Sequence, residues 1–302
     1  MQKVNHHPVV CFGEVLWDIL PSRAVPGGAP MNVAYHLKKL GYEPALITKV
    51  GVDDRGQKLF DLMEANKITT DYFQVDHEME TGKVYATIQN NNEVEYDIVK
   101  PVAWDYIEWD QSFKELVENA SFFIFGSLAA RSQVSKNTLF TLLEIAKKKV
   151  LDINLRAPHF NRRIVEELLQ KADFVKMNNN ELELITGWFS DHSSLEDRIQ
   201  TIVNRFNLSG MAVTMGGDGA ILYMDGKFTR HPGFKITVVD TVGSGDAFLA
   251  GLISKMMTNS LPVEALEFAG GMGAFIATQT GACPVYARED VEDLIIKNSI
   301  VS

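Results

Sequence analysis

Short apolar runs alternate with longer amphipathic segments along most of this chain. Each apolar run has the length of a buried strand, and each amphipathic segment is long enough for a helix. We expect strands at residues 9–13, 45–50, 121–126, 150–153, 174–177 and 211–214, and helices at residues 31–40, 56–65, 135–148, 164–171, 195–206, 246–257 and 263–278. This alternation predicts a three-layer α/β fold, in which a mostly parallel sheet carries helices on both faces. Such sheets bind ligands at the carboxyl ends of their strands.

One region departs from this alternation. Residues 83–89 and 94–99 alternate polar and apolar side chains, and residues 90–93 between them (Asn, Asn, Asn, Glu) favour a turn. The pattern predicts a β-hairpin with one face toward solvent or a ligand. We interpret the hairpin as part of a small β flap inserted in the α/β core. The alternative is a surface hairpin without function.

Charge and cysteine content narrow the classes of partner and compartment. The 302 residues include 29 Lys and Arg and 39 Asp and Glu, which gives a net charge of −10. Broad binding to nucleic acid or to anionic membranes needs basic surface, so we expect neither partner, although a local site can still hold a small anion. Cys11 and Cys283 are too few for a disulfide framework, and we expect both to be reduced core residues. We predict no signal peptide and no membrane span, and therefore a cytoplasmic protein.

The segment at residues 240–248, Asp-Thr-Val-Gly-Ser-Gly-Asp-Ala-Phe, precedes and begins a predicted helix. Gly243 and Gly245 let the backbone approach a ligand, and the first N–H groups of a helix lack internal partners, so the segment can hold an anion. Asp246 stands at the helix start. A carboxylate beside an anion site suits a base that takes a proton from a hydroxyl as that hydroxyl attacks a phosphoryl group. The alternative is a Gly-rich turn with Asp246 as a helix-start residue.

A second glycine pair precedes the first predicted helix, at residues 26–32 (Pro-Gly-Gly-Ala-Pro-Met-Asn). Gly28 would allow close approach of the backbone, and Asn32, one turn into the helix, could hydrogen-bond a polyol. Asp18 follows the first strand and could accept hydrogen bonds from two sugar hydroxyls. By itself a Gly-Gly pair is most often only a turn.

Polar residues also follow two later strands. In residues 152–156 (Asp-Ile-Asn-Leu-Arg), Arg156 could pair with a substrate hydroxyl or a phosphate, or be a surface residue. In residues 178–181, Asn178 and Glu181 suit Mg²⁺, which keeps its waters and binds mainly to substrate phosphates. A helix N-terminus with Glu181 in its first turn explains the same residues equally well.

The segment at residues 214–220, Thr-Met-Gly-Gly-Asp-Gly-Ala, lies between a predicted strand and an apolar run. Its glycines would let a nucleotide lie against the backbone, and a plain strand–turn–strand is the competing explanation. It lacks the dinucleotide-binding fingerprint, which disfavours an NAD-dependent oxidoreductase. The chain also lacks P-loop, protein-kinase, zinc-site and hydrolase-elbow motifs.

These segments, in this order, resemble the ribokinase-like (PfkB) family of carbohydrate kinases over residues 9–288. Residues 240–248 resemble the family's C-terminal signature, and residues 27–32 its N-terminal one. Within the family the chain is most similar to bacterial fructokinases, at residues 12–18, 27–30, 101–105 and 152–156, the last of which 2-keto-3-deoxygluconate kinases share. The resemblance implies an α/β core with a β-sheet lid over a sugar site. We expect a single domain at residues 1–302, with the lid built from about residues 14–27 and 81–104.

The resemblance also implies a role for each candidate residue. These roles are the catalytic base, Asp246; the anion hole, Gly243, Ser244 and Gly245; the sugar contacts, Asp18, Gly28 and Asn32; the magnesium and phosphate motif, Asn178 and Glu181; the nucleotide site, Thr214, Gly216 and Gly219; and a monovalent-cation site, Asp240. The implied cofactors are ATP and Mg²⁺, with K⁺ as an optional one. A homodimer through the lids is a further expectation from the resemblance.

The resemblance implies ATP-dependent transfer of the γ-phosphoryl group to a sugar hydroxyl. We expect conversion of fructose to fructose 6-phosphate, with closure of the hairpin at residues 83–99 over the sugar. The alternatives are a 2-keto-3-deoxygluconate kinase, for which Arg156 would be the cationic partner, and a ribokinase. A noncatalytic sugar-binding protein on the same scaffold is a third alternative.

Overall fold

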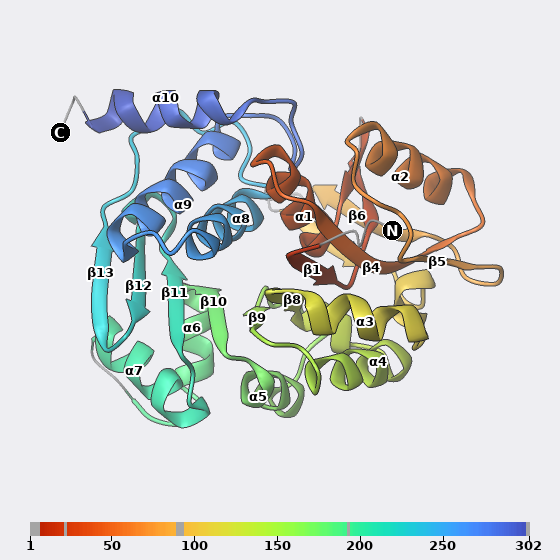
Figure 1. Ribbon diagram of the computed structural model, residues 1–302, viewed down its shortest axis with the longest axis horizontal. Coiled ribbons are helices and arrows are strands. Elements are labelled where there is room, and N and C mark those ends of the chain that lie inside the picture. The colour runs from red at the N-terminus through yellow and green to blue at the C-terminus, as the bar shows by residue number, and fades with distance from the viewer. Residues whose placement is uncertain (1–6, 21–22, 89–93, 192–193, 300–302) are drawn as a thin grey trace, which may run out of the picture.

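A nine-stranded sheet runs through the molecule (Figure 1). The computed structural model describes residues 7–20, 23–88, 94–191 and 194–299. The strand order is β13-β12-β11-β10-β9-β8-β1-β4-β5. Neighbouring strands from β11 to β5 pair in parallel, whereas β12 and β13 are antiparallel. The strands are β1 Val9–Phe12, β4 Pro44–Gly51, β5 Phe73–Asp76, β8 Phe122–Gly126, β9 Lys149–Asp152, β10 Phe174–Asn178, β11 Gly210–Thr214, β12 Ala220–Met224 and β13 Lys227–His231.

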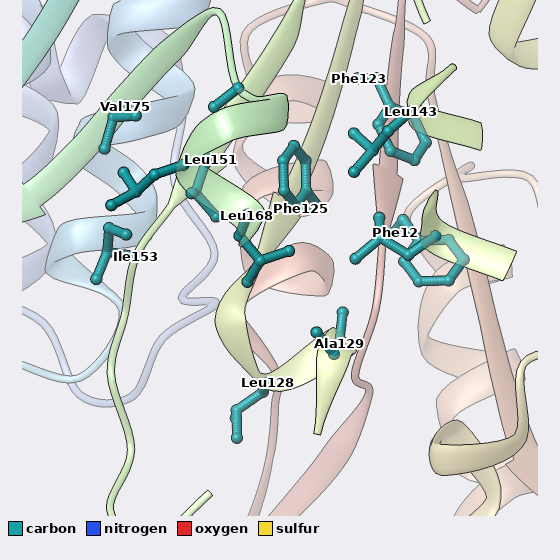
Figure 2. Close-up of a cluster of buried hydrophobic side chains, with 14 of the residues drawn as sticks. Phe12, Phe123, Phe125, Leu128, Ala129, Leu143, Leu151, Ile153, Leu168 and Val175 are labelled. Carbon is teal, nitrogen blue, oxygen red and sulfur yellow. The ribbon is translucent and has the colours of Figure 1, made fainter. Parts of the chain in front are cut away.

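Helices cover both faces of this sheet, and each face has its own apolar core. The alternation of side chains along a strand produces this division. In β1, Val9 and Cys11 belong to one cluster, and Val10 and Phe12 belong to the other, which Figure 2 shows around Phe123. The first cluster packs against α1 Ala29–Lys39, α2 Asp54–Ala65, α8 Ser244–Met257, α9 Pro262–Ala277 and α10 Arg288–Ser299, and the second against α3 Gln111–Asn119, α4 Gln133–Leu143, α5 Arg162–Lys171, α6 Asn179–Thr186 and α7 Leu195–Phe206. The predicted three-layer α/β fold is confirmed.

A separate four-stranded sheet has the order β3-β2-β6-β7. Its strands are β2 Leu16–Leu20, β3 Arg23–Gly27, β6 Gly82–Ile88 and β7 Val94–Ile98. The antiparallel pairing of β6 with β7 confirms the predicted hairpin, whose turn residues 90–93 lie outside the described part of the chain. Because β2 pairs in parallel with β6, two segments distant in sequence form one small sheet.

Several element boundaries differ from the sequence prediction. The helix expected at residues 135–148 ends at Leu143, and residues 144–148 form a turn and a bend before β9. The end of that segment carries Lys147 and Lys148, which offer no apolar face to the core. The sequence prediction also missed β5, β13, α3, α6 and α10 as separate elements.

Candidate active site

The two glycine-rich segments meet where α1 packs against α8. Asn32 in α1 donates from Nδ2 to Oδ2 of Asp246 in α8, at 2.8 Å. The Sγ of Cys283 donates to Oδ1 of the same asparagine at 3.3 Å, so both ends of the Asn32 amide are engaged. Cys11 is buried in the core as predicted, whereas Cys283 is only half-buried and borders this site. The predicted base and one predicted sugar contact are therefore direct neighbours.

The protein around Asp246 raises the pKa of its carboxyl group above the value of an aspartate in water. Desolvation by the surrounding protein, followed by the nearby Asp152 carboxylate, raises the pKa of Asp246 to about 6. Lys176, the hydrogen bond from Asn32, and Arg156 act in the opposite direction. Efficient general bases have a pKa close to the working pH, so this carboxylate is ionised near neutrality and still basic enough to accept a proton.

The start of α8 is built for close backbone approach. Gly243 is the residue before the helix, with a φ of 78°, and a Cβ there would lie 2.6 Å from the Cβ of Ala282. Ser244 is the first helical residue, and its buried Oγ has no hydrogen-bond partner among the described residues. A Cβ on Gly245 would lie 2.9 Å from the Nζ of Lys176. The N–H of Ser244 already donates to the Thr241 oxygen at 3.2 Å. The remaining first-turn amides, beside the unpartnered Ser244 hydroxyl, form a site that an anion can complete.

Asp18 on β2 lies near the same charged groups. A Cβ on Gly27 would stand 2.4 Å from the Oδ2 of Asp18, so this glycine leaves room for the carboxylate. Burial raises the pKa of Asp18 to about 6. The positive charge of Arg156 lowers this pKa, and the negative charge of Asp240 raises it further. Arg156 is exposed, and its charge acts on both Asp18 and Asp246. The structure thus gathers Asp18, Arg156 and Asp246 in one region.

Gly28 allows the chain to enter α1 tightly. Its φ is 114°, and a Cβ would lie 2.4 Å from the backbone oxygen of Glu14. Its own oxygen accepts from the backbone N–H of Asn32 at 2.9 Å, which forms the first turn of the helix. Gly28 is therefore required for the placement of Asn32, whatever contact it makes itself.

Asp240 holds together two loops. Its Oδ1 accepts from the N–H of Val242 at 3.0 Å, and its Oδ2 from the N–H of Gly281 at 3.1 Å. A nitrogen of Arg23 on β3 lies 3.9 Å from the same Oδ2. Each Asp240 oxygen therefore already receives a backbone donor.

Asn178 and Glu181 form a capping box at the start of α6. The Oδ1 of Asn178 accepts from the N–H of Glu181 at 2.9 Å, and the Oε2 of Glu181 accepts from the N–H of Asn178 at 2.8 Å. The Oε1 of Glu181 accepts from the N–H of Leu155 at 2.8 Å, which ties α6 to the loop after β9. The helix-start alternative thus describes their local geometry, and both carboxylate oxygens already accept backbone hydrogen bonds.

A cleft of about 500 Å³ opens beside these residues. It is lined by Asn178, Asn179, Asn180, Leu195, Thr214, Met215, Gly216 and Asp218. Thr214 and Gly216 thus face the cleft, as the nucleotide prediction requires. Gly219 is placed differently: its φ is 84°, and a Cβ would lie 1.9 Å from the backbone oxygen of His231. It permits the tight β11–β12 connection to pack against the end of β13.

Three buried charged residues of this region have no role predicted from the sequence. Lys176 pairs with Asp152, with Nζ 3.0 Å from Oδ1 and 3.1 Å from Oδ2. Glu14 follows β1, is 2% exposed, and has an Oε2 without a hydrogen-bond partner among the described residues. Desolvation by burial raises the pKa of Glu14 to about 7, and Asp246 adds to the rise. A charged residue inside or directly after an apolar strand is the signal that could have identified all three.

The fold and the gathered polar groups, which lie where strands of an α/β sheet end and where α8 begins, are of the kind that a phosphotransferase requires. The chain belongs to the pfkB family of carbohydrate kinases, because the sequence model of that family matches residues 22–287. The expected fold, enzyme class and family are therefore confirmed. In the described part of the chain, no group of three or more His, Cys, Asp or Glu side chains could hold a metal ion. None of the described helices combines the length and the apolar character that membrane crossing requires.

Two relatives and one solved structure are similar to this chain over nearly its whole length. A probable fructokinase-7 of Arabidopsis thaliana is 30% identical over 317 residues, which cover 95% of this chain and 92% of that protein. Fructokinase-1 of Zea mays is 30% identical over 319 residues, covering 96% and 98%. The crystal structure of fructokinase from Vibrio cholerae O395, with fructose, ADP and calcium ion bound, superimposes with a TM-score of 0.82 at 22% identity, covering 96% of this chain and 99% of the other.

Proposed function

We propose that this carbohydrate kinase transfers the γ-phosphoryl group of ATP to O6 of fructose. The observation that carries the proposal is the position of the Asp246 carboxylate. This carboxylate lies in the first turn of α8, beside an anion site, and accepts a hydrogen bond from Asn32 of α1. A pure sugar binder has no use for a base at that point. The choice of fructose is supported by relatives that are named fructokinases and are about 30% identical.

Each part of the site has a place in the proposed reaction. Asp246 takes the proton of the sugar hydroxyl and so activates its oxygen as the nucleophile. At the start of α8, the amides of Gly243 and Gly245 and the unpartnered hydroxyl of Ser244 stabilise the negative charge on the transferring phosphoryl group. Asp18, Gly28 and Asn32 bind and orient the sugar, and Thr214 and Gly216 border the nucleotide in the cleft. Gly219 shapes that border, because it permits the tight β11–β12 connection.

The residues present fit a magnesium ion held mainly by phosphates and water. Both oxygens of Glu181 already accept backbone hydrogen bonds, so Glu181 would reach the ion through water. The amides of Asn178, Asn179 and Asn180 at the cleft add oxygen groups of the kind that Mg²⁺ accepts. When bound, the ion neutralises phosphate charge.

Arg156 favours one alternative, an acid sugar such as 2-keto-3-deoxygluconate. However, the Asp18 carboxylate lies close enough to Arg156 for the two charges to interact. It would therefore repel a substrate carboxylate bound to Arg156. A neutral sugar avoids this repulsion and fits the pair better. A coupled assay of ADP release over fructose, ribose and 2-keto-3-deoxygluconate tests the proposal. Fructose should give the highest kcat/KM, and sugar binding without any ADP release would favour a noncatalytic protein.

We further propose that the four-stranded sheet is a lid within a single domain, and that it closes to exclude water during transfer. The base of its hairpin is fixed to the core, because Arg131 donates to the Val99 oxygen at 2.7 Å and pairs with Asp105 at 2.7 Å. Hydrogen exchange in β6 and β7 should slow when fructose and nucleotide are both present. Unchanged exchange there would count against a moving lid.

Three further expectations stay proposals. A cytoplasmic location fits the chain's composition, and a homodimer through the lids is tested by light scattering. K⁺ near Asp240 is an optional cofactor, since that carboxylate already accepts two backbone hydrogen bonds and lies near Arg23. Rates measured in K⁺ and in a bulky organic cation decide whether the ion matters.

A further inference from the structure

Lys176 is a charged residue in the interior of the large sheet. It lies on β10, between β9 and β11, and is 7% exposed. Its partner in register on β9 is Asp152, which is 3% exposed, and the ammonium contacts both Asp152 oxygens, at 3.0 and 3.1 Å. Moving two charges out of water is costly, and a buried ion pair is weak support for stability alone. The position of this pair therefore invites a functional reason.

The Lys176 ammonium lies against the start of α8. A Cβ on Gly245 would stand only 2.9 Å from its Nζ, and the next residue is Asp246. A helix N-terminus carries partial positive charge, which disfavours a cation there unless negative groups are close by. Three carboxylates, Asp152, Asp246 and Glu181, supply the negative charge that holds the ammonium there. Asp152 contacts the ammonium directly, and the charges of Asp246 and Glu181 also act on it.

We propose that Lys176 is a positioning residue for phosphoryl transfer, which keeps Asp246 a carboxylate at neutral pH while Asp152 fixes where the ammonium stands. The proposal rests on the role of Asp246 as the base. It assigns the two ends of the ion pair opposite effects on that base. Lys176 stabilises the ionised Asp246, and Asp152 destabilises it.

Other charged groups near Asp246 do not replace Lys176. Asp152 adds negative charge. Glu14, on the segment after β1, has a pKa raised to about 7 and is mostly protonated where Asp246 titrates. Arg156, on the loop after β9, adds positive charge, but it is exposed and its field is screened by water and salt. On α1 the neighbour is the neutral Asn32, and after α9 it is the thiol of Cys283, whose pKa burial raises. Lys176 is thus the buried cation of this set.

The test is the pH dependence of kcat/KM for the sugar in two variants. Lys176→Met removes the positive charge, so the acidic limb of the profile should move up by about one pH unit or more. Asp152→Asn removes the competing negative charge, so the limb should move down. Combining both changes removes a neutral pair, and the limb should return close to its position in the unchanged protein. A structural role alone predicts loss of stability in both single variants and no opposite shifts.

A matched control exists elsewhere in the same sheet. Lys49 on β4 is also 7% exposed and pairs with Asp76 at 3.1 Å. It stands four strands away from β10. Lys49→Met should cost stability in the same way as Lys176→Met and leave the acidic limb in place. Lys176→Arg keeps the positive charge and should leave the acidic limb at its native pH. This variant can be measured if Lys176→Met does not fold.

The outcomes separate this inference from the proposed function. If folded Lys176→Met keeps the native limb, or if both single variants move it the same way, Lys176 does not set the charge state of Asp246. If Lys176→Met does not fold, Asp152→Asn with an unmoved limb overturns the inference. By contrast, near-normal turnover of Asp246→Asn overturns the base itself. Absence of fructose phosphorylation with intact turnover of another sugar overturns only the substrate.

Discussion

Asn32 and Asp246 are 214 positions apart in sequence, yet the amide of the first donates to the carboxylate of the second at 2.8 Å. The contact joins the start of α1 to the start of α8, and the two helices pack side by side against the sheet (Figure 1). Each helix begins directly after a glycine with a positive φ, Gly28 and Gly243. The base is therefore placed by the meeting of two tight turns, one from each end of the chain.

Asp246→Asn should abolish most of the turnover. The amide is nearly the same size as the carboxylate but cannot accept the proton of the sugar hydroxyl. We expect kcat to fall by about 1,000-fold, with the Kd for the sugar changed little, since general-base catalysis contributes on the order of 100- to 10,000-fold. Steady-state ADP release gives kcat, and calorimetric titration gives the Kd. Turnover within about tenfold of the unchanged protein would remove Asp246 from the mechanism.

The rate should depend on pH through the same carboxylate. The pKa of Asp246 is raised to about 6, and only the ionised form accepts a proton. At saturating nucleotide, kcat/KM for the sugar should therefore be level above this value and fall about tenfold per pH unit well below it. Asn32→Asp adds a second carboxylate next to the first and should move this acidic limb upward. A profile unchanged by Asn32→Asp would contradict the close pairing of the two side chains.

The sequence contained enough to predict the layers, the hairpin and the regions that form the site. Local patterns carried this information, because alternating polarity and glycines before helices reflect nearby residues. It did not show that Asn178 and Glu181 cap each other, since a capping box and a metal motif use the same residues. Nor did it identify the Lys176–Asp152 pair, because register between β9 and β10 comes only from tertiary structure. A charged residue directly after an apolar strand marks Glu14 as unusual, but its role depends on the tertiary surroundings that bury it.

The entry into α1 should depend on the missing side chain of Gly28. Gly28→Ala would force a Cβ to within 2.4 Å of the Glu14 oxygen in addition to the strain of a φ of 114°. Gly41→Ala is the matched control, because its φ is 89° and no atom lies within 4 Å of the added Cβ. We expect the control to cost about 1 kcal/mol of unfolding free energy, and Gly28→Ala at least about 3 kcal/mol. Urea unfolding measures both, and equal losses would contradict the close approach.

The buried Glu14 should make stability depend on pH, in a direction that its pKa sets. The pKa is raised from 4.5 to about 7 in the folded protein, so between these values the folded state holds a proton that the unfolded state has released. Stability from this group is therefore lost as the pH rises through that window. Glu14→Gln cannot ionise, so it should stabilise the protein at about pH 8, on the order of 2 kcal/mol, and change it little at about pH 5. Urea unfolding at the two pH values measures the difference, and the exposed Glu64→Gln is the control that should change neither. Equal effects of Glu14→Gln at both pH values would contradict the raised pKa of Glu14 in the folded protein.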